Sequence, residues 1–301
     1  MRMQKTILRS VRLCGVGLHT GEEVEITLNP APPDTGIVFK RVDVDVDEPI
    51  KVSLKECRAD AMRGSILIRD GVRILTVEHL LSAIRGLEID NLLVEVRGSE
   101  IPALDGSALP FAEKLLEAGI VSQPSLKRIL RLDRPVWVSS GDSLVAAFPY
   151  PTFKVSYTIA YDHPFLKAQF LSYDFSPESF LKDIAPARTY AFKRDVEQIL
   201  ENGLGKGGSL SNTILIGSEG VLNPEGLRFE DEFVRHKILD LIGDMAFLGS
   251  WIYAHIVAIK AGHALHLKLV SKIVEEVEGK VAEDRCYNEG FTPPLSLSSC
   301  G

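Results

Sequence analysis

Short runs of alternating or continuously apolar residues dominate the first part of the chain, and helical spacing interrupts them twice. Turn residues bound four such runs, which predicts strands at 6–13, 24–28, 65–69 and 73–75. Asp70-Gly71 predicts a tight hairpin turn between the last two strands. A helix is predicted from Val77 to its end at Gly86, and then a strand at 91–96 and a helix at 109–118.

The second part of the chain repeats this order after a polar run that contains Pro124. The pattern predicts strands at 128–132, 136–139, 144–148 and 154–160, then an irregular stretch at 162–225, a long helix at 232–248, a strand at 251–259 and a helix at 264–277. Strands, helix, strand and helix thus occur twice, which predicts an α+β protein built by internal duplication. We expect two similar domains, 1–124 and 125–301, with the boundary at 121–127.

Composition narrows the class of protein. The 301 residues, 45% of them hydrophobic, suffice for a sizeable core, and a net charge of −7 predicts no nucleic-acid partner. The four cysteines form no CxxC pair, which argues against a disulfide framework or a cysteine zinc site and favours a reducing compartment. The N-terminus has no apolar signal segment, and the longest apolar stretch, 246–261, is too short to span a bilayer. We therefore expect a cytoplasmic protein with at most peripheral membrane contact.

Helical spacing places three polar residues along the predicted helix at 232–248. His236 and Asp240 are four residues apart and so lie on one face, and Asp244 continues the stripe. A single pair of this kind usually belongs to a solvated face. Here the neighbouring residues are apolar nearly all round the helix, so the polar stripe needs partners, and a cation is one good partner.

Glu78-His79, at the start of the first predicted helix, is a second polar group. Alone, it is also consistent with a capping carboxylate beside a buried histidine. Together, His79, His236 and Asp240 supply two imidazoles and a carboxylate, and catalytic zinc takes three such ligands while leaving a position for water. Glu78 could then accept a proton as water attacks a carbonyl carbon.

Gly262-His263-Ala264 lies at the predicted turn between the last strand and the last helix. Asp244 could hydrogen-bond the ring of His263 and raise its pKa, and a charged imidazole could stabilise an oxyanion or protonate a leaving amine. A purely structural histidine is the alternative. The glycine-rich run at 203–209 lacks phosphate-loop spacing and instead predicts a loop that lets a bulky or acyl chain approach the backbone.

Two other functions share parts of this pattern. Two histidines and a carboxylate also form the facial triad of non-haem Fe(II) oxygenases. Glu78 beside a ligand favours hydrolysis over that reaction, and the strand order of a jelly roll is missing. A non-catalytic sugar- or lipid-binding protein is the second alternative, and the joint presence of Glu78, the three ligands and His263 argues against it.

The motifs resemble those of the UDP-3-O-acyl-N-acetylglucosamine deacetylase family. The matching segments occur in family order across nearly the whole chain and are specific in combination: 15–21, 76–83, 101–107, 187–189, 227–244 and 262–265. The resemblance implies two similar domains in a layered sandwich with helices between the sheets. It also implies a monomeric zinc hydrolase that removes the N-acetyl group from a UDP-linked acylated glucosamine, the committed deacetylation step of lipid A biosynthesis.

The resemblance also implies roles for individual residues. Zn²⁺, with Fe²⁺ as an alternative occupant, would be held by His79, His236 and Asp240. The catalytic groups would be Glu78 as general base, His263 at the oxyanion or leaving amine, Asp244 as its orienting partner and Thr189 as a donor to the tetrahedral intermediate. Lys237 would meet a substrate phosphate or the sugar.

An insertion at about 188–216 would hold the substrate in this family. The residues expected to line or edge a passage for the acyl chain are Phe192, Val196, Gly205, Ser209 and Thr213, with Leu18 and Met62 at its entrance. Tyr161 and Asp195 match positions near the uridine and its diphosphate. His19 lies near the site by the same analogy but is not counted as a ligand. Tyr190 and Gly205 depart from the commoner family residues, and both departures concern the shape of the substrate site.

Overall fold

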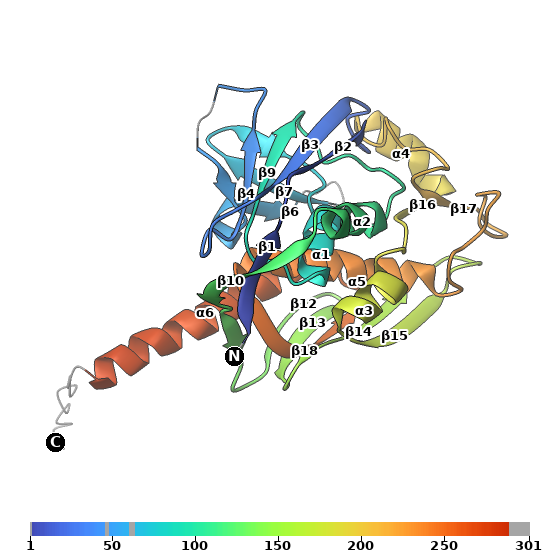
Figure 1. The fold of residues 1–301 in the computed structure, drawn as a ribbon. Coiled ribbons are helices and arrows are strands. Elements are labelled where there is room, and N and C mark those ends of the chain that lie inside the picture. Colours follow the sequence, from blue (N-terminus) through green and yellow to red (C-terminus); the bar gives the residue numbers. More distant parts are fainter. Residues whose placement is uncertain (1, 46–47, 60–63, 289–301) are drawn as a thin grey trace, which may run out of the picture.

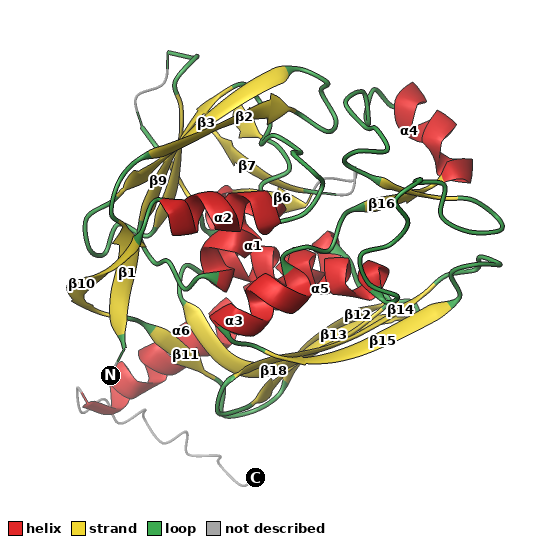
Figure 2. Ribbon diagram, turned by 45° about the vertical axis from the view of Figure 1, so that its right-hand side comes forward, coloured by secondary structure: helices red, strands yellow, loops and turns green. Residues whose placement is uncertain are grey.

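A computed structural model describes residues 2–45, 48–59 and 64–288 of the chain. Two main β-sheets face each other, and helices lie between them (Figure 1, Figure 2). The chain is therefore an α+β protein in sheet–helix–sheet layers, as predicted.

The two main sheets share one strand order and one pattern of directions. The first has the order β2 (Val11–Val16), β3 (Glu23–Pro30), β9 (Leu92–Arg97), β4 (Ile37–Arg41), β5 (Ile50–Lys51). The second has the order β12 (Val136–Ser140), β13 (Ser143–Pro149), β18 (Trp251–Ile259), β14 (Phe153–Ala160), β15 (Ala168–Asp174), with β11 (Ile129–Arg131) beside β18. In both, the third and fourth strands are parallel and the other neighbours along that path are antiparallel.

Helices occupy matching places in the two halves. The longer ones are α1 (Glu78–Gly86), α2 (Leu109–Glu117), α5 (Glu232–Asp244), which continues into the 3₁₀ turn η4 (Met245–Leu248), and α6 (His263–Asn288). In each half a helix precedes the third strand of the sheet and another helix follows it. All nine residues of α1 are buried, as are eleven of the thirteen in α5, so these two helices form the centre of the molecule.

Smaller elements surround this frame. The strands are β1 (Met3–Ile7) with β10 (Ile120–Leu126), β6 (Cys57–Ala59) with β7 (Ser65–Arg69) and β8 (Val72–Ile74), and β16 (Tyr190–Phe192) with β17 (Ile214–Ile216). The short helices are η1 (Leu54–Glu56), α3 (Pro177–Ser179), the π-helical turn η2 (Phe180–Ile184), η3 (Lys193–Asp195) and α4 (Val196–Glu201).

Most of the predicted elements are present. The hairpin between β7 and β8 is an example in which the local sequence determines the turn. Asp70 and Gly71 have φ values of 50° and 83°, the left-handed pair that a two-residue turn between twisted strands needs. The single strand predicted at 6–13 is wrong. The chain leaves the strand conformation at 8–10, so that β1 pairs with β10 while β2 joins the first main sheet.

The polar run at 121–127, the predicted domain boundary, lies largely in strand β10. Between Met3 and Lys5 the pairing of β1 and β10 slips, and Pro124 lies within that irregularity. A proline cannot donate a hydrogen bond to a neighbouring strand, and an edge strand with a bulge tolerates it. The residue types that mark a loop are thus accommodated in a two-stranded ribbon.

A close helix crossing joins the halves. A Cβ atom added to Gly243 of α5 would collide with the backbone carbonyl oxygen of Glu78 in α1. Only a glycine lets the two helices approach this closely. The start of α1 is therefore held directly against the last turn of α5.

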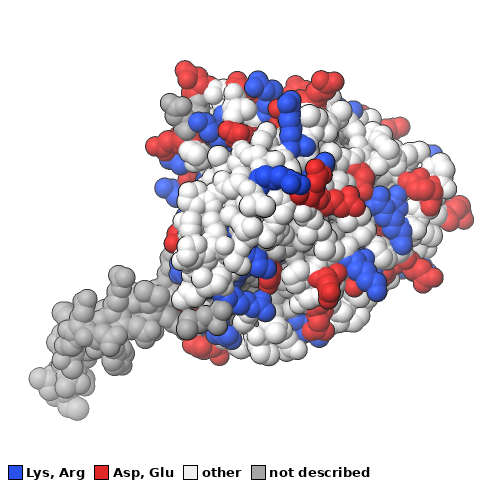
Figure 3. Space-filling model, viewed as in Figure 1, with Lys and Arg blue, Asp and Glu red and all other residues white. Residues whose placement is uncertain are grey.

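No helix within the described ranges is both long and apolar enough to cross a membrane. The face of the molecule in Figure 3 carries Lys and Arg side chains interspersed with Asp and Glu.

Candidate active site

The crossing of α1 and α5 gathers the polar residues of both helices. Glu78 and His79 are the first two residues of α1, and His236, Asp240 and Asp244 follow one another at four-residue intervals on α5. All five side chains are buried. The polar stripe predicted on α5 therefore faces the interior, and its partners come from both halves of the chain.

His79, His236 and Asp240 form a group that we call the open triad. The Oδ1 atom of Asp240 lies 3.3 Å from Nε2 of His236 and 3.6 Å from Nε2 of His79. One ligand atom from each residue lies within 4.8 Å of the others. Among the described residues, Oδ1 of Asp240 is a buried oxygen without a hydrogen-bond partner. An unsatisfied buried carboxylate oxygen between two imidazole nitrogens fits a divalent cation.

Neighbouring groups orient the open triad. His236 donates from Nδ1 to the carbonyl of Ala187 at 3.1 Å, which leaves Nε2 free to face Asp240. Burial lowers the pKa of His236 to about 3, so the ring is neutral, as a metal ligand must be. Burial acts to raise the pKa of Asp240, but its interactions with His236 and Lys237 hold it well below its ordinary value. Lys237 donates to Oδ2 of Asp240 at 2.6 Å.

Glu78 lies next to this group in the sequence and in space. Its Oε2 accepts a hydrogen bond from the backbone N–H of Ser65 at 3.1 Å. Burial raises the pKa of Glu78, while the charges of His263 and His79 act in the other direction. A carboxylate with a raised pKa is a stronger base than an exposed one.

Asp244, His263 and His266 form a second group, the closed triad. His263 and His266 each donate from Nδ1 to the same atom, Oδ2 of Asp244, at 2.8 Å. Ser65 donates from Oγ to Oδ1 of Asp244 at 2.6 Å. The hydrogen bond expected between Asp244 and His263 is present, whereas the roles of His266 and Ser65 did not emerge from the sequence.

Charge in the closed triad is shared between the rings and the carboxylate. Burial acts to lower the pKa of His263, but the adjacent Asp244 carboxylate raises it to about 9. Burial acts to raise the pKa of Asp244, but His263 and His266 bring it down to about 2. The Nε2 atom of His263 lies 3.8 Å from Oδ2 of Asp240, so a protonated ring faces the open triad.

Both triads have the donor types of a metal site, but they differ in whether those atoms already have hydrogen-bond partners. In the closed triad each Nδ1 already donates to Asp244, and both oxygens of Asp244 are occupied. The open triad leaves Oδ1 of Asp240 unsatisfied. The cation therefore fits the open triad, and the closed triad is explained by protons alone.

Aromatic side chains extend from the open triad toward the second-half insertion. Tyr190 packs its ring edge-on against His236, with 6.1 Å between ring centroids, and its hydroxyl lies 2.7 Å from that of Tyr161. Tyr161 in turn contacts Phe192 at 5.1 Å between centroids. The backbone N–H of Thr189 donates to the carbonyl of Gly106, which ties this segment to the first half. Of these residues, predicted to bind substrate or the intermediate, Tyr190 thus lies against the open triad, and Tyr161 and Phe192 follow it outward.

The glycine-rich part of the insertion packs on the loop at 17–21. Gly205 has a φ of 66°, and the following two residues donate backbone hydrogen bonds to the carbonyls of His19 and Leu18. Leu18 therefore lies beside the insertion. Thr213 donates its backbone N–H to the carbonyl of Ser209 at 2.9 Å, which closes the end of the loop.

The remaining predicted substrate residues are less closely tied to the triads. Asp195 and Val196 lie where α4 begins, and Figure 1 places α4 at the edge of the molecule beyond β16. Met62 lies outside the described residues.

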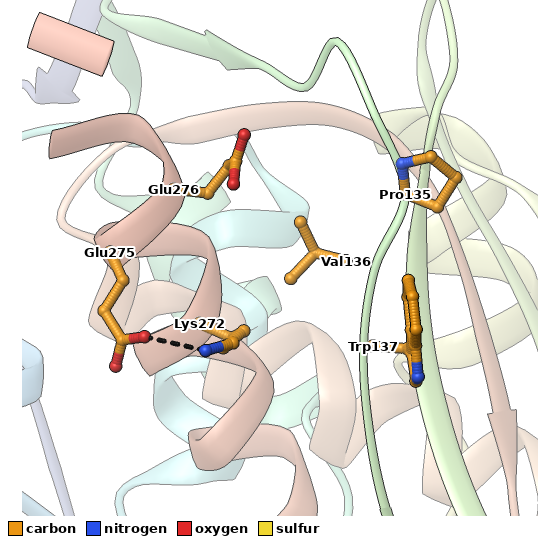
Figure 4. Close-up of a pocket in the computed structure, with 6 residues that line it drawn as sticks. All are labelled: Pro135, Val136, Trp137, Lys272, Glu275 and Glu276. Carbon is orange, nitrogen blue, oxygen red and sulfur yellow. Dashed lines mark hydrogen bonds and ion pairs between the residues drawn. The ribbon is translucent and has the colours of Figure 1, made fainter. Parts of the chain in front are cut away.

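A surface cleft between β12 and α6 is separate from these groups. It is lined by Pro135, Val136, Trp137, Lys272, Glu275 and Glu276 (Figure 4). Lys272 pairs with Glu275 at 3.1 Å, and Trp137 is 62% exposed. The cleft contains none of the candidate catalytic residues.

Fold and site together define a class of protein. It is an α+β protein whose halves meet around a buried His-His-Asp group with a second carboxylate alongside, which is the donor set of catalytic zinc sites.

Comparison with known proteins gives the family. The family model described as LpxC, UDP-3-O-acyl N-acetylglycosamine deacetylase, matches residues 4–275. A protein named UDP-3-O-acyl-N-acetylglucosamine deacetylase from Marinobacter nauticus is 44% identical over 298 residues, covering 98% of this chain and 97% of the relative. Its namesakes from Saccharophagus degradans and Chromobacterium violaceum are 45% and 47% identical, each covering 92% of this chain and 91% and 92% of their own. The chain belongs to the LpxC family.

Proposed function

We propose that this protein hydrolyses the N-acetyl group of UDP-3-O-acyl-N-acetylglucosamine, releasing acetate and a free amine, with Zn²⁺ held by His79, His236 and Asp240. The observation that carries the proposal is the unsatisfied Oδ1 of Asp240, which faces both imidazole Nε2 atoms inside a member of this family. Fe²⁺ is an alternative occupant of the same donor set. When bound, the metal supplies Lewis acidity and makes hydroxide available near neutral pH.

Glu78 acts as the general base in this proposal. Its carboxylate is buried next to the ligand His79 and is fixed on one side by the Ser65 N–H. Its raised pKa favours taking a proton from water as the water attacks the amide carbon.

His263 supplies positive charge and a proton in this proposal. The Asp244 carboxylate keeps its ring protonated and directs Nε2 toward the open triad. A protonated imidazole there stabilises the oxyanion of the tetrahedral intermediate or protonates the leaving amine. Asp244 thereby acts as its orienting partner.

Substrate recognition falls to residues around this centre. Thr189 would donate a hydrogen bond to the tetrahedral intermediate. Lys237 uses one N–H on Asp240, and the two that remain would meet a substrate phosphate or the sugar. Tyr161 and Asp195 would lie near the uridine diphosphate. The other residues that we assign to the acyl passage or its edge are Tyr190, Phe192, Val196, Gly205, Ser209, Thr213, Leu18 and Met62.

The wider assignments follow from the same proposal. The reaction would be the committed deacetylation of lipid A biosynthesis, carried out by a cytoplasmic monomer with at most peripheral membrane contact. We also infer that the halves at 1–124 and 125–301 arose by duplication. The matched strand order of the two main sheets supports this.

Acetate release from the UDP-sugar substrate, with and without a chelator, tests the function directly. We expect release that stops when the metal is removed and returns when Zn²⁺ is added back.

Glu78→Gln keeps the shape of the side chain but removes the base, so we expect metal content to stay at the wild-type level and acetate release to be nearly abolished. Unchanged release from this variant would remove Glu78 from the mechanism.

The same assay separates the rival functions. Activity that requires molecular oxygen would indicate an Fe(II) oxygenase instead. Binding of the UDP-sugar without any acetate release from the metal-loaded protein would indicate a non-catalytic binding protein.

A further inference from the structure

We propose that His266 and Tyr157 are positioning residues for the reaction, which act on His263 through Asp244. The inference rests on the proposed function, because these two residues would orient His263, the residue that faces the open triad.

The first observation is that two rings share one oxygen atom. His266 is fully buried on α6, three residues after His263, so both rings project from the same side of the helix. Each lies 2.8 Å through Nδ1 from Oδ2 of Asp244. An ionised carboxylate only accepts hydrogen bonds, so both rings donate from Nδ1. The carboxylate is thus held by two donors that converge on one atom.

The second observation is a chain of contacts behind His266. Its Nε2 lies 3.1 Å from the hydroxyl oxygen of Tyr157, and the carbonyl oxygen of Ala261 lies 2.8 Å from the same hydroxyl, so the single hydroxyl proton bonds one of these two acceptors at a time. Tyr157 is fully buried in β14, and burial raises the pKa of its hydroxyl, so the group stays protonated. Ala261 lies two residues before His263. The chain therefore starts at the turn that carries His263 and returns to its ring through Asp244.

The turn itself needs this support. Lys260 has a φ of 49°, a conformation that costs a residue with a side chain free energy. Its backbone N–H donates to the carbonyl of Thr158, the residue after Tyr157. Strand β14 thus holds the turn at Lys260 and at Ala261, while it also anchors the ring of His266.

These contacts leave little freedom to Asp244. Ser65 occupies Oδ1, and the two histidines occupy Oδ2. Without the donor on His266, Oδ2 keeps a single donor, and the carboxylate can rotate toward it. The ring of His263 would then lose its fixed direction toward the open triad, although His263 itself is intact.

Two isosteric substitutions separate donation from packing. In His266→Asn the side-chain amide nitrogen takes the place of Nδ1 and can still donate to Asp244. In His266→Leu a side chain of the same shape has no donor. For His266→Leu we expect kcat to fall about 10- to 100-fold, as is usual when the outer partner of a site residue is removed. We expect KM and zinc content to stay unchanged, and His266→Asn to recover most of the loss.

Tyr157→Phe removes only the hydroxyl group at the far end of the chain. We expect it to lower kcat less than His266→Leu does, again without a change in KM. His255→Leu is the matched control, because His255 is a partly exposed histidine on β18 whose ring contacts Ser156 rather than the triads. We expect wild-type kcat from it.

A readout that does not depend on turnover distinguishes this inference from the proposed function. In the zinc-loaded protein with ¹⁵N-labelled histidine, the Nδ1–H resonance of His263 reports its bond to Asp244. We expect this resonance to shift in His266→Leu and to stay in place in His266→Asn.

Wild-type kcat or an unmoved His263 resonance in His266→Leu overturns the inference. Absence of acetate release from the wild-type protein contradicts the proposed function, and the resonance still decides the role of His266. If His266→Leu does not fold, an unmoved His263 resonance in Tyr157→Phe, together with unchanged kcat, overturns the inference.

Discussion

The open and closed triads contain the same residue types, two histidines and one aspartate, and their aspartates lie on neighbouring turns of α5. In the closed triad each histidine Nδ1 donates a hydrogen bond to Asp244, and both oxygens of that carboxylate accept hydrogen bonds. In the open triad the Oδ1 of Asp240 has neighbours at 3.3 and 3.6 Å but no hydrogen bond. Residue type alone therefore does not distinguish a metal site from a proton-holding site. The distinction lies in which buried atoms are left unsatisfied.

Removal of the carboxylate from the open triad should have the largest effect. In Asp240→Ala only two imidazoles remain, and catalytic zinc sites take three protein ligands. We expect metal and acetate release to be lost together, as measured by elemental analysis and by the acetate assay. Wild-type metal content in this variant would show that the ligand set is wrong.

The same kind of change in the closed triad should leave the metal in place. Asp244→Asn offers an amide where two Nδ1–H groups need acceptors, so His263 loses both its orientation and its charge partner. We expect metal content to be unchanged and kcat to fall by about 100-fold or more, in line with the loss that follows an Asp-to-Asn change behind a catalytic histidine. Loss of metal in Asp244→Asn would mean that the two triads are not separate in function.

The distance between α1 and α5 can be changed without substituting a residue of either triad. In Gly243→Ala the new methyl group must displace the backbone of Glu78, and with it His79. Overpacking of this kind costs about 1–3 kcal/mol of folding stability. We expect weaker zinc binding in a competition assay with a chelator and a lower melting temperature. Gly220→Ala is the control, since its added Cβ would have its nearest neighbour at 4.0 Å; equal zinc affinity in the two variants would contradict the role of this crossing.

The smallest expected effect is a pH-dependent change in stability. The pKa of His263 is raised from 6.5 to about 9 in the folded protein. The stability that this contributes is fully present below about pH 6.5 and is lost as pH rises through about 9. In the metal-free protein, we expect the stability advantage of wild type over Asp244→Asn to shrink across that interval in urea unfolding curves. An advantage that grows with pH would contradict a protonated His263.

Several parts of the fold and site could be predicted from local patterns. Asp70-Gly71 and the four-residue spacing of His236 and Asp240 depend only on near neighbours, so the hairpin and the polar stripe of α5 follow from the sequence. The partner role of Asp244 toward His263 could also be anticipated, since the single strand β18 separates their helices.

Other parts depend on contacts between distant segments. The convergence of His266 and His263 on one oxygen depends on how α6 is rotated against α5, which its own residues do not determine. Ser65 reaches Asp244 only because β7 lies beside the crossing of the helices. Pro124 and its polar neighbours have the composition of a loop, and pairing with β1 turns them into a strand.

The position of His79 early in the chain and of Asp240 late in it has a consequence for synthesis. When α1 leaves the ribosome, α5 is still unmade, so the nascent first half lacks the second-half partners of the two polar residues at the start of its helix. Contacts between segments so far apart form slowly. An ion that binds only the completed arrangement stabilises the finished fold over every earlier one.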